Sequence, residues 1–167
     1  MGDRPRRLVV TAHHEAGHAW MADGLGVTIK GATIVWRGPI LGSVFLDWPN
    51  AIDAATRVQR LIPIRLAGPV AESIFLGSPD VRRGNDYKAI TMMLEPKYGG
   101  EEVRKILYDC EDLVRKALAH GWVAVSALAA TLMEDRTIDG KHAHAVLAAG
   151  RPLPFWVAQM EQMTKTR

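Results

Sequence analysis

The chain has 167 residues, of which 48% are hydrophobic and 23% charged, and its formal net charge is +3. This composition fits one soluble globular domain over residues 1–167. Basic residues are spread along the chain apart from Arg4, Arg6 and Arg7 at the start, so we expect no nucleic-acid partner. No apolar run approaches the roughly 20 residues of a membrane helix, so no membrane segment is expected either.

The first predicted helix covers residues 12–25, with Thr11 as its N-cap and the glycines at 24 and 26 at its end. It carries the run His14-Glu15-Ala16-Gly17-His18. Side chains four residues apart share one helix face, with Cβ atoms roughly 5–6 Å apart. Two imidazoles at that spacing can bind one zinc ion, with Zn–N bonds of about 2.0–2.1 Å. Glu15 would lie beside the metal and take a proton from a metal-bound water.

Gly17 within this motif and His13 just before it lead to two further predictions. Gly17 costs up to ~1 kcal/mol relative to Ala inside a helix, and close approach of another backbone would justify that cost. His13 lies about 100° around the helix from His14, so it cannot share the metal cleanly. We expect His13 either to support the site from outside or to be exposed.

The next segments change their periodicity. Residues 27–36 and 41–48 are β-rich runs separated by a turn at residues 37–40, which predicts a hairpin or a small sheet. Residues 51–76 return to a helical pattern. Pro63 and the pair Gly68-Pro69 predict a kink or a break in that helix.

The second half of the chain reads as helices. A loop at residues 77–80 precedes a helix that starts near Asn85 and ends before Tyr98. Long amphipathic and shorter helices follow over residues 101–119, 122–134 and 139–149. Cys110 keeps helical step with the apolar residues around it, which predicts core packing rather than a nucleophile or ligand. The predicted fold class is therefore mainly α (α+β), with a small β element.

A catalytic zinc site usually has three protein ligands and one open position for water. Asp86 is one candidate for the third ligand, although an acid at a helix start is also an ordinary N-terminal signal. Glu72 is the other, because a carboxylate in an apolar helix needs a partner, and Arg65 could be that partner. Asp80 and Asp47 are weaker candidates. These residues by themselves leave Asp86 and Glu72 equally eligible.

Several blocks resemble the protease domain of FtsH-type ATP-dependent zinc metalloproteases, over roughly residues 9–149. The two specific blocks are Thr11 to Trp20, which contains His-Glu-Ala-Gly-His-Ala, and Gly84-Asn85-Asp86-Tyr87-Lys88-Ala89-Ile90. Supporting blocks lie at residues 32–42, 66–77 and 128–140. The chain departs from the family at Pro69, where Arg is usual, and at Ile90, where Thr is usual.

The resemblance implies His14, His18 and Asp86 as zinc ligands, Glu15 as catalytic base, and Glu72 as a residue that supports the site. It implies a zinc metallopeptidase that hydrolyses flexible or unfolded polypeptides, whose substrate adds as a strand to the edge of the β element. The sequence has no P-loop, so we expect the peptidase domain alone, with any ATPase supplied by a separate partner. The family's ring-forming protease domains point to a homo-oligomer. The single cysteine favours a reducing compartment, hence a cytoplasmic location.

Two other hypotheses use the same residues. A non-catalytic zinc-binding interaction module would have four ligands and a closed site. A different zinc hydrolase or deaminase would also fit the helix, but no second cysteine exists for the base-deaminase signature. His142 and His144 could be proposed as extra ligands. Two residues apart on a helix they point to different faces, so solvated side chains are favoured.

Overall fold

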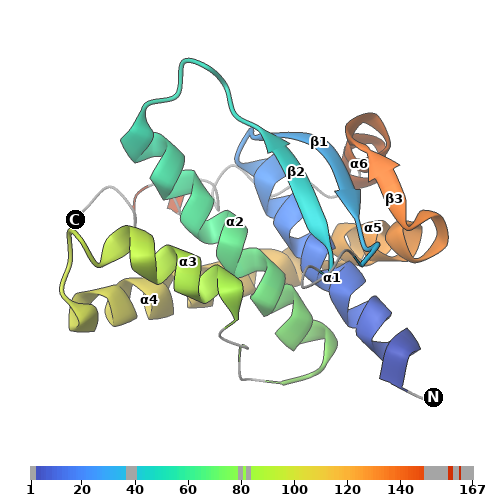
Figure 1. Cartoon of the computed structure of the whole chain (residues 1–167), viewed down its shortest axis with the longest axis horizontal. Coiled ribbons are helices and arrows are strands. Elements are labelled where there is room, and N and C mark those ends of the chain that lie inside the picture. The colour runs from blue at the N-terminus through green and yellow to red at the C-terminus, as the bar shows by residue number, and fades with distance from the viewer. Residues whose placement is uncertain are drawn as a thin grey trace.

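The computed structural model describes residues 3–36, 41–78, 81, 84–148, 158, 159 and 162. The expected turn at 37–40, Asp80 and the end of the last expected helix at Ala149 lie outside these residues. The described residues form six helices and three strands (Figure 1). In chain order these are α1 Asp3–Gly24, β1 Thr28–Thr33, β2 Ser43–Asp47, α2 Ala54–Phe75, α3 Asn85–Leu94, α4 Gly100–His120, α5 Trp122–Asp135, β3 Thr137–Asp139 and α6 Gly140–Leu147. The mainly α (α+β) fold is confirmed.

Helix α1 begins at Asp3, so the prediction that Thr11 is its N-cap is wrong. Thr11 lies inside the helix, where its hydroxyl donates a 2.9 Å hydrogen bond to the carbonyl of Arg7. That bond to the residue four positions earlier is the usual alternative to capping for a threonine within a helix. The predicted glycine end is confirmed. Gly26 has φ of +70°, and the amide of Val27 donates to the carbonyl of Ala22 at 2.9 Å, as in a Schellman motif.

Helix α2 runs unbroken through Pro63 and Pro69, so the break that these prolines suggested is absent. It begins after Asp53, whose side chain accepts from the amide of Thr56 at 2.9 Å. Both prolines lie in its buried segment, which contacts α1 and α4. Burial of this apolar segment keeps the helix together where proline removes backbone hydrogen bonds.

The small sheet has the order β2-β1-β3, and both pairings are antiparallel. The β1–β2 pair is the one expected from the sequence. Strand β3 was not expected, because three residues are too few to show a pattern and its partner lies about a hundred positions earlier. Ile138 of β3 is buried opposite Ala32, and the hydroxyls of Thr33 and Thr137 lie 2.6 Å apart.

Helix α1 lies between α2 and the sheet, as Figure 1 shows, and it also contacts α5. Its closest approach is to α2. A β-carbon on Gly17 would lie 2.5 Å from the carbonyl oxygen of Ala67 and 2.7 Å from the β-carbon of Ala71. The expected backbone contact at Gly17 is therefore confirmed, and it brings two helices together beside His14 and His18.

The remaining helices match the predicted pattern. Cys110 is 5% exposed and belongs to the buried face of α4, which confirms its expected place in the core. Among the described residues, no single helix has the length and apolar character needed to cross a membrane. Only α4 and α5 taken together, with a 79° bend at their junction, meet that test.

Candidate metal centre

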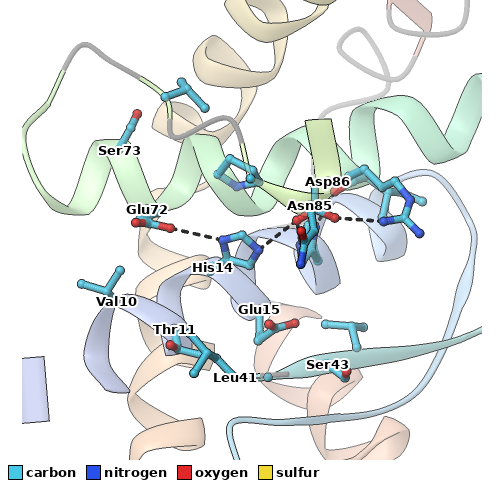
Figure 2. Close-up of a pocket in the computed structure, with 18 of the residues that line it drawn as sticks. Val10, Thr11, His14, Glu15, Leu41, Ser43, Glu72, Ser73, Asn85 and Asp86 are labelled. Carbon is cyan, nitrogen blue, oxygen red and sulfur yellow. Dashed lines mark hydrogen bonds and ion pairs between the residues drawn. The ribbon is translucent and has the colours of Figure 1, made fainter. Parts of the chain in front are cut away.

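Three polar side chains from two helices converge at one point. His14 and His18 lie on α1, and Asp86 comes from the first turn of α3. Figure 2 shows His14 and Asp86 facing each other. The Oδ2 atom of Asp86 lies 3.3 Å from Nε2 of His14 and 3.6 Å from Nε2 of His18. One candidate ligand atom from each residue lies within 4.8 Å of the other two. Ligands at 2.0–2.1 Å from a tetrahedral zinc ion are about 3.3 Å apart, so the set fits such an ion.

Glu72 lies on the other side of the His14 ring. Its Oε2 atom is 3.4 Å from Nδ1 of His14, whereas Asp86 faces Nε2 of the same ring (Figure 2). Glu72 can therefore orient the imidazole while Asp86 shares a metal with it. The partner suggested for Glu72 was Arg65, but the structure pairs Arg65 with Asp86 instead, at 3.0 Å.

His18 is oriented by the backbone of α2. Its Nδ1 atom lies 2.7 Å from the carbonyl oxygen of Ile64, and since a carbonyl can only accept, Nδ1 carries the proton. Nε2 of the neutral ring is then left with its lone pair directed at the convergence point. This pattern is typical of histidines that bind a metal.

Gly68 of α2 leaves the space that a cation would need. A β-carbon on Gly68 would lie 2.3 Å from Nε2 of His18 and 2.7 Å from Nε2 of His14. A side chain there would occupy the region in front of both nitrogens. The sequence offered Gly68 only as a helix-breaking signal beside Pro69, so this role was missed.

The carboxyl group of Glu15 enters the same cleft. Glu15 is 6% exposed, and a β-carbon on Gly42 would lie 2.6 Å from its Oε1 atom. Burial raises the pKa of Glu15 above its ordinary value, although the nearby charges of His18 and His14 oppose the shift. A carboxylate with a raised pKa is a better proton acceptor near neutral pH than an exposed one. No sequence pattern indicated that Gly42 would contact this carboxyl group.

When no cation is bound, the pKa of His14 is raised and the pKa of Asp86 is lowered from their ordinary values. Burial disfavours protonation of His14, but Asp86, Glu72 and the charge of Glu15 outweigh it and raise the pKa of His14 to about 9. Burial likewise opposes ionisation of Asp86, yet its contacts with His14 and His18 hold its pKa below the ordinary range. The site therefore favours a positive charge next to the Asp86 carboxylate.

These residues line a cleft of about 1220 Å³ between α1, β2, α2 and the start of α3. Leu41, Val44 and Leu46 form its apolar wall on the β2 side. Arg6 and Arg7 also line it, because α1 extends further towards the N-terminus than the sequence predicted. The candidate metal centre is thus part of the lining of this cleft.

The other residues considered from sequence lie elsewhere. His13 is neither exposed nor part of the site: it is 9% exposed, stacks on Phe75 at 4.0 Å between centroids, and lies 2.9 Å through Nδ1 from the carbonyl oxygen of Val9. Asp47 pairs with Lys30 at 3.2 Å.

The two histidines of α6 do not join the metal cluster either. His144 is not simply solvated, because its Nδ1 lies 2.6 Å from Oδ1 of the buried Asp23. His142 lies 3.9 Å from Asp135, and both side chains are about half exposed.

Comparison with known proteins gives two distant relatives, and no family model matches the chain. The ATP-dependent zinc metalloprotease FtsH 2 of Thermoanaerobacter sp. (strain X514) is 28% identical over 156 aligned residues, covering 77% of this chain and 30% of the relative. The ATP-dependent zinc metalloprotease FtsH 4 of Sorangium cellulosum (strain So ce56) is 26% identical over an alignment 212 positions long, which covers 92% of this chain and 32% of the relative. The chain spans about a third of the length of each relative. Over most of its length it is therefore related, at low identity, to zinc metalloproteases of the FtsH type.

Proposed function

We propose that this protein is a zinc-dependent metallopeptidase in which His14, His18 and Asp86 hold the metal and Glu15 acts as the general base. One observation carries the proposal: the two Nε2 atoms and one carboxylate oxygen converge, with the Glu15 carboxyl group in the same cleft. The low-identity relationship to FtsH zinc metalloproteases supports zinc as the ion and peptide hydrolysis as the reaction.

The chain's own residues divide the chemistry between them. Zinc, when bound, would lower the pKa of a water molecule towards about 7 and polarise the substrate carbonyl. A carboxylate oxygen of Glu15 takes a proton from the attacking water and later gives it to the nitrogen of the leaving amine. Ile64 and Glu72 keep the rings of His18 and His14 oriented throughout.

An extended polypeptide suits this groove. In the part of the chain that the structure describes, β2 pairs only with β1, so its other edge can accept a strand. Ser43, Val44 and Leu46 of this strand line the cleft. A substrate added along β2 would pass directly over Glu15, with its backbone held by hydrogen bonds of the sheet type. We therefore propose flexible or unfolded polypeptides as the substrate class, since a folded protein offers few extended segments.

Further properties that the sequence led us to expect stand as proposals. Both relatives are named ATP-dependent, so we propose that an ATPase delivers substrates to this peptidase region and that it acts as a separate partner. Self-association into a homo-oligomer and a cytoplasmic location belong to the same proposal. A closed, non-catalytic zinc module would need a fourth ligand, and the cluster found among the described residues has three.

The first test is Glu15→Gln, which keeps the size of the side chain and removes its basicity. The variant should bind zinc as the parent does, while hydrolysis of an unstructured protein such as casein falls by about 10²–10⁴-fold. A chelator should abolish hydrolysis by the parent, and added zinc should restore it. Hydrolysis that survives both treatments would contradict the proposed chemistry.

Asp86→Ala tests the third ligand, and Glu72→Ala is its matched control on the other side of His14. Zinc occupancy should fall sharply in Asp86→Ala, because two imidazoles alone leave the ion poorly held. Glu72→Ala should lower affinity by only about 10–100-fold, as expected for a residue that orients a ligand. The reverse order of effects would return the ligand role to Glu72.

A further inference from the structure

Residues of helix α2 contact all three candidate ligands, His14, His18 and Asp86. The Ile64 carbonyl accepts from His18, Glu72 lies against Nδ1 of His14, and Arg65 donates to Asp86. Gly68 of the same helix lies against the Nε2 atoms of both histidines. The first two of these contacts orient imidazole rings, which is a common arrangement. The third, from Arg65, is made to the carboxylate itself.

The contact divides the two oxygens of Asp86 between different partners. Oδ2 faces the Nε2 atoms of His14 and His18, at 3.3 and 3.6 Å. Oδ1 accepts a 3.0 Å hydrogen bond from Nη1 of Arg65. A carboxylate can bind a cation through one oxygen or through both. With Oδ1 engaged by a guanidinium, only Oδ2 remains free to bind.

Among the described residues at the start of α3, the N-cap does not fix the carboxylate in this way. The N-cap of α3 is Gly84, which has no side chain that could make a capping hydrogen bond. Asp86 is the acid of the first helical turn, and the charge of the helix terminus attracts either oxygen without selecting one. A directional donor is needed to select between them, and a guanidinium is such a donor.

Arg65 is held at the site although the arrangement leaves one of its atoms unsatisfied. Its side chain is 37% exposed, but its Nε atom is buried and has no hydrogen-bond partner in the described part of the chain. A buried donor without a partner is unfavourable, and an arginine bonded only to water would avoid it. The hydrogen bond to Asp86 therefore offsets the cost of the buried Nε atom. An incidental ion pair at the surface is too weak to do this.

We propose that Arg65 is a positioning residue that holds Asp86 as a single-oxygen ligand and keeps the fourth position of the metal open for water. The inference rests on the proposed metal site. Without Arg65, Oδ1 is free to turn towards the ion as a fifth ligand atom that crowds that position, or to turn the carboxylate towards solvent. The guanidinium also places a positive charge beside a cleft that contains three carboxyl groups, those of Glu15, Glu72 and Asp86.

The experiment compares Arg65→Met and Arg65→Lys with Arg57→Met as the matched control. Arg57 lies on the same helix, is exposed, and packs over the Trp48 ring at 5.2 Å, away from the cleft. Each metal-free protein is titrated with zinc alone against a competing chelator. It is then titrated with Co²⁺, whose visible absorption reports the number of ligands. Thermal melting of the metal-free proteins checks that each variant is folded.

Arg65→Met should bind zinc about 10–100-fold more weakly than the parent. Its Co²⁺ spectrum should become weaker, as a four-coordinate site gains a fifth ligand atom. Arg65→Lys keeps a single positive donor and should recover part of the affinity, whereas Arg57→Met should match the parent in both measurements. A structural role alone would lower thermal stability without changing the Co²⁺ spectrum.

Two results would overturn the inference, and only the second would also reject the proposed metal site. Parent-like zinc affinity and Co²⁺ spectra in both Arg65 variants would reject the role of Arg65 and leave the metal site intact. A parent protein that takes up neither ion would reject the metal site and the role of Arg65 together. If Arg65→Met does not fold, Arg65→Lys decides, because a parent-like spectrum there with unchanged affinity rejects the need for a guanidinium.

Discussion

Gly68 of α2 lies directly against the imidazole ring of His18 in the candidate metal centre. A β-carbon on Gly68 would lie 2.3 Å from Nε2 of His18, which is less than any van der Waals separation. The absent side chain therefore defines the room in front of the nitrogen that would bind the cation. The size of this site is set by helix α2 as much as by the residues that point into it.

Gly68→Ala should therefore abolish tight zinc binding without removing a ligand. The added methyl group would push both imidazoles out of position, and we expect affinity to fall by about 100-fold or more. Gly99→Ala is the control, since a β-carbon there meets no atom within 4 Å. The measurement is a zinc titration of both metal-free proteins. Parent-like affinity in Gly68→Ala would show that the cation does not bind in front of these nitrogens.

Gly42→Ala should separate catalysis from metal binding. A β-carbon there would lie 2.6 Å from Oε1 of Glu15, the mobile end of a side chain, so the carboxyl group would move aside and the fold would remain. A displacement of about 1 Å can lower a rate by roughly 100-fold, so we expect kcat to fall by that order. Zinc affinity should stay unchanged, and Gly100→Ala should behave as the parent. An unchanged kcat would argue against Glu15 as the base.

Zinc uptake should weaken as the pH falls. The pKa of His14 is raised to about 9 in the metal-free protein, while a ligand imidazole must be neutral. Below that pH each ion must displace a proton, so the apparent affinity should fall by about tenfold per pH unit. Asp86 does not add to this effect, because its lowered pKa keeps it ionised throughout. Zinc titrations from pH 7 to 9 check the slope, and a flat profile would contradict it.

Gly17→Ala should lower the free energy of unfolding, although helix propensity alone would raise it. Helix propensity alone would make the variant more stable by up to ~1 kcal/mol. Its β-carbon would lie 2.5 Å from the carbonyl oxygen of Ala67, so α1 and α2 would have to separate. We expect a net loss of ~1–3 kcal/mol in the free energy of unfolding, seen as a lower Tm. A raised Tm would show that the two helices are less tightly packed here.

The local features of this protein followed from sequence for a simple reason. Helix geometry fixes residues four apart on one face, so the pairing of His14 with His18 and the position of Glu15 needed no knowledge of the rest of the chain. The same holds for the buried stripe around Cys110 and for the end of α1 at Gly26. The resemblance to FtsH-type proteases, rather than spacing, favoured Asp86 over Glu72.

The long-range features depended on packing between helices that are distant in sequence. Residue spacing alone left Asp86 and Glu72 as equal candidates. In the structure, the docking of α3 puts Asp86 on the Nε2 side of His14, and Glu72 lies on the Nδ1 side. The same packing pairs Arg65 with Asp86 instead of with Glu72, the partner suggested from the sequence. Propensity alone left a break at Pro63 or Pro69 open, which the structure does not show, because propensity counts lost hydrogen bonds but not the burial that offsets them. Sequence by itself determined which side chains could bind a metal, whereas the tertiary structure decided which atoms of those side chains meet, since contacts between helices arise only from the packed core.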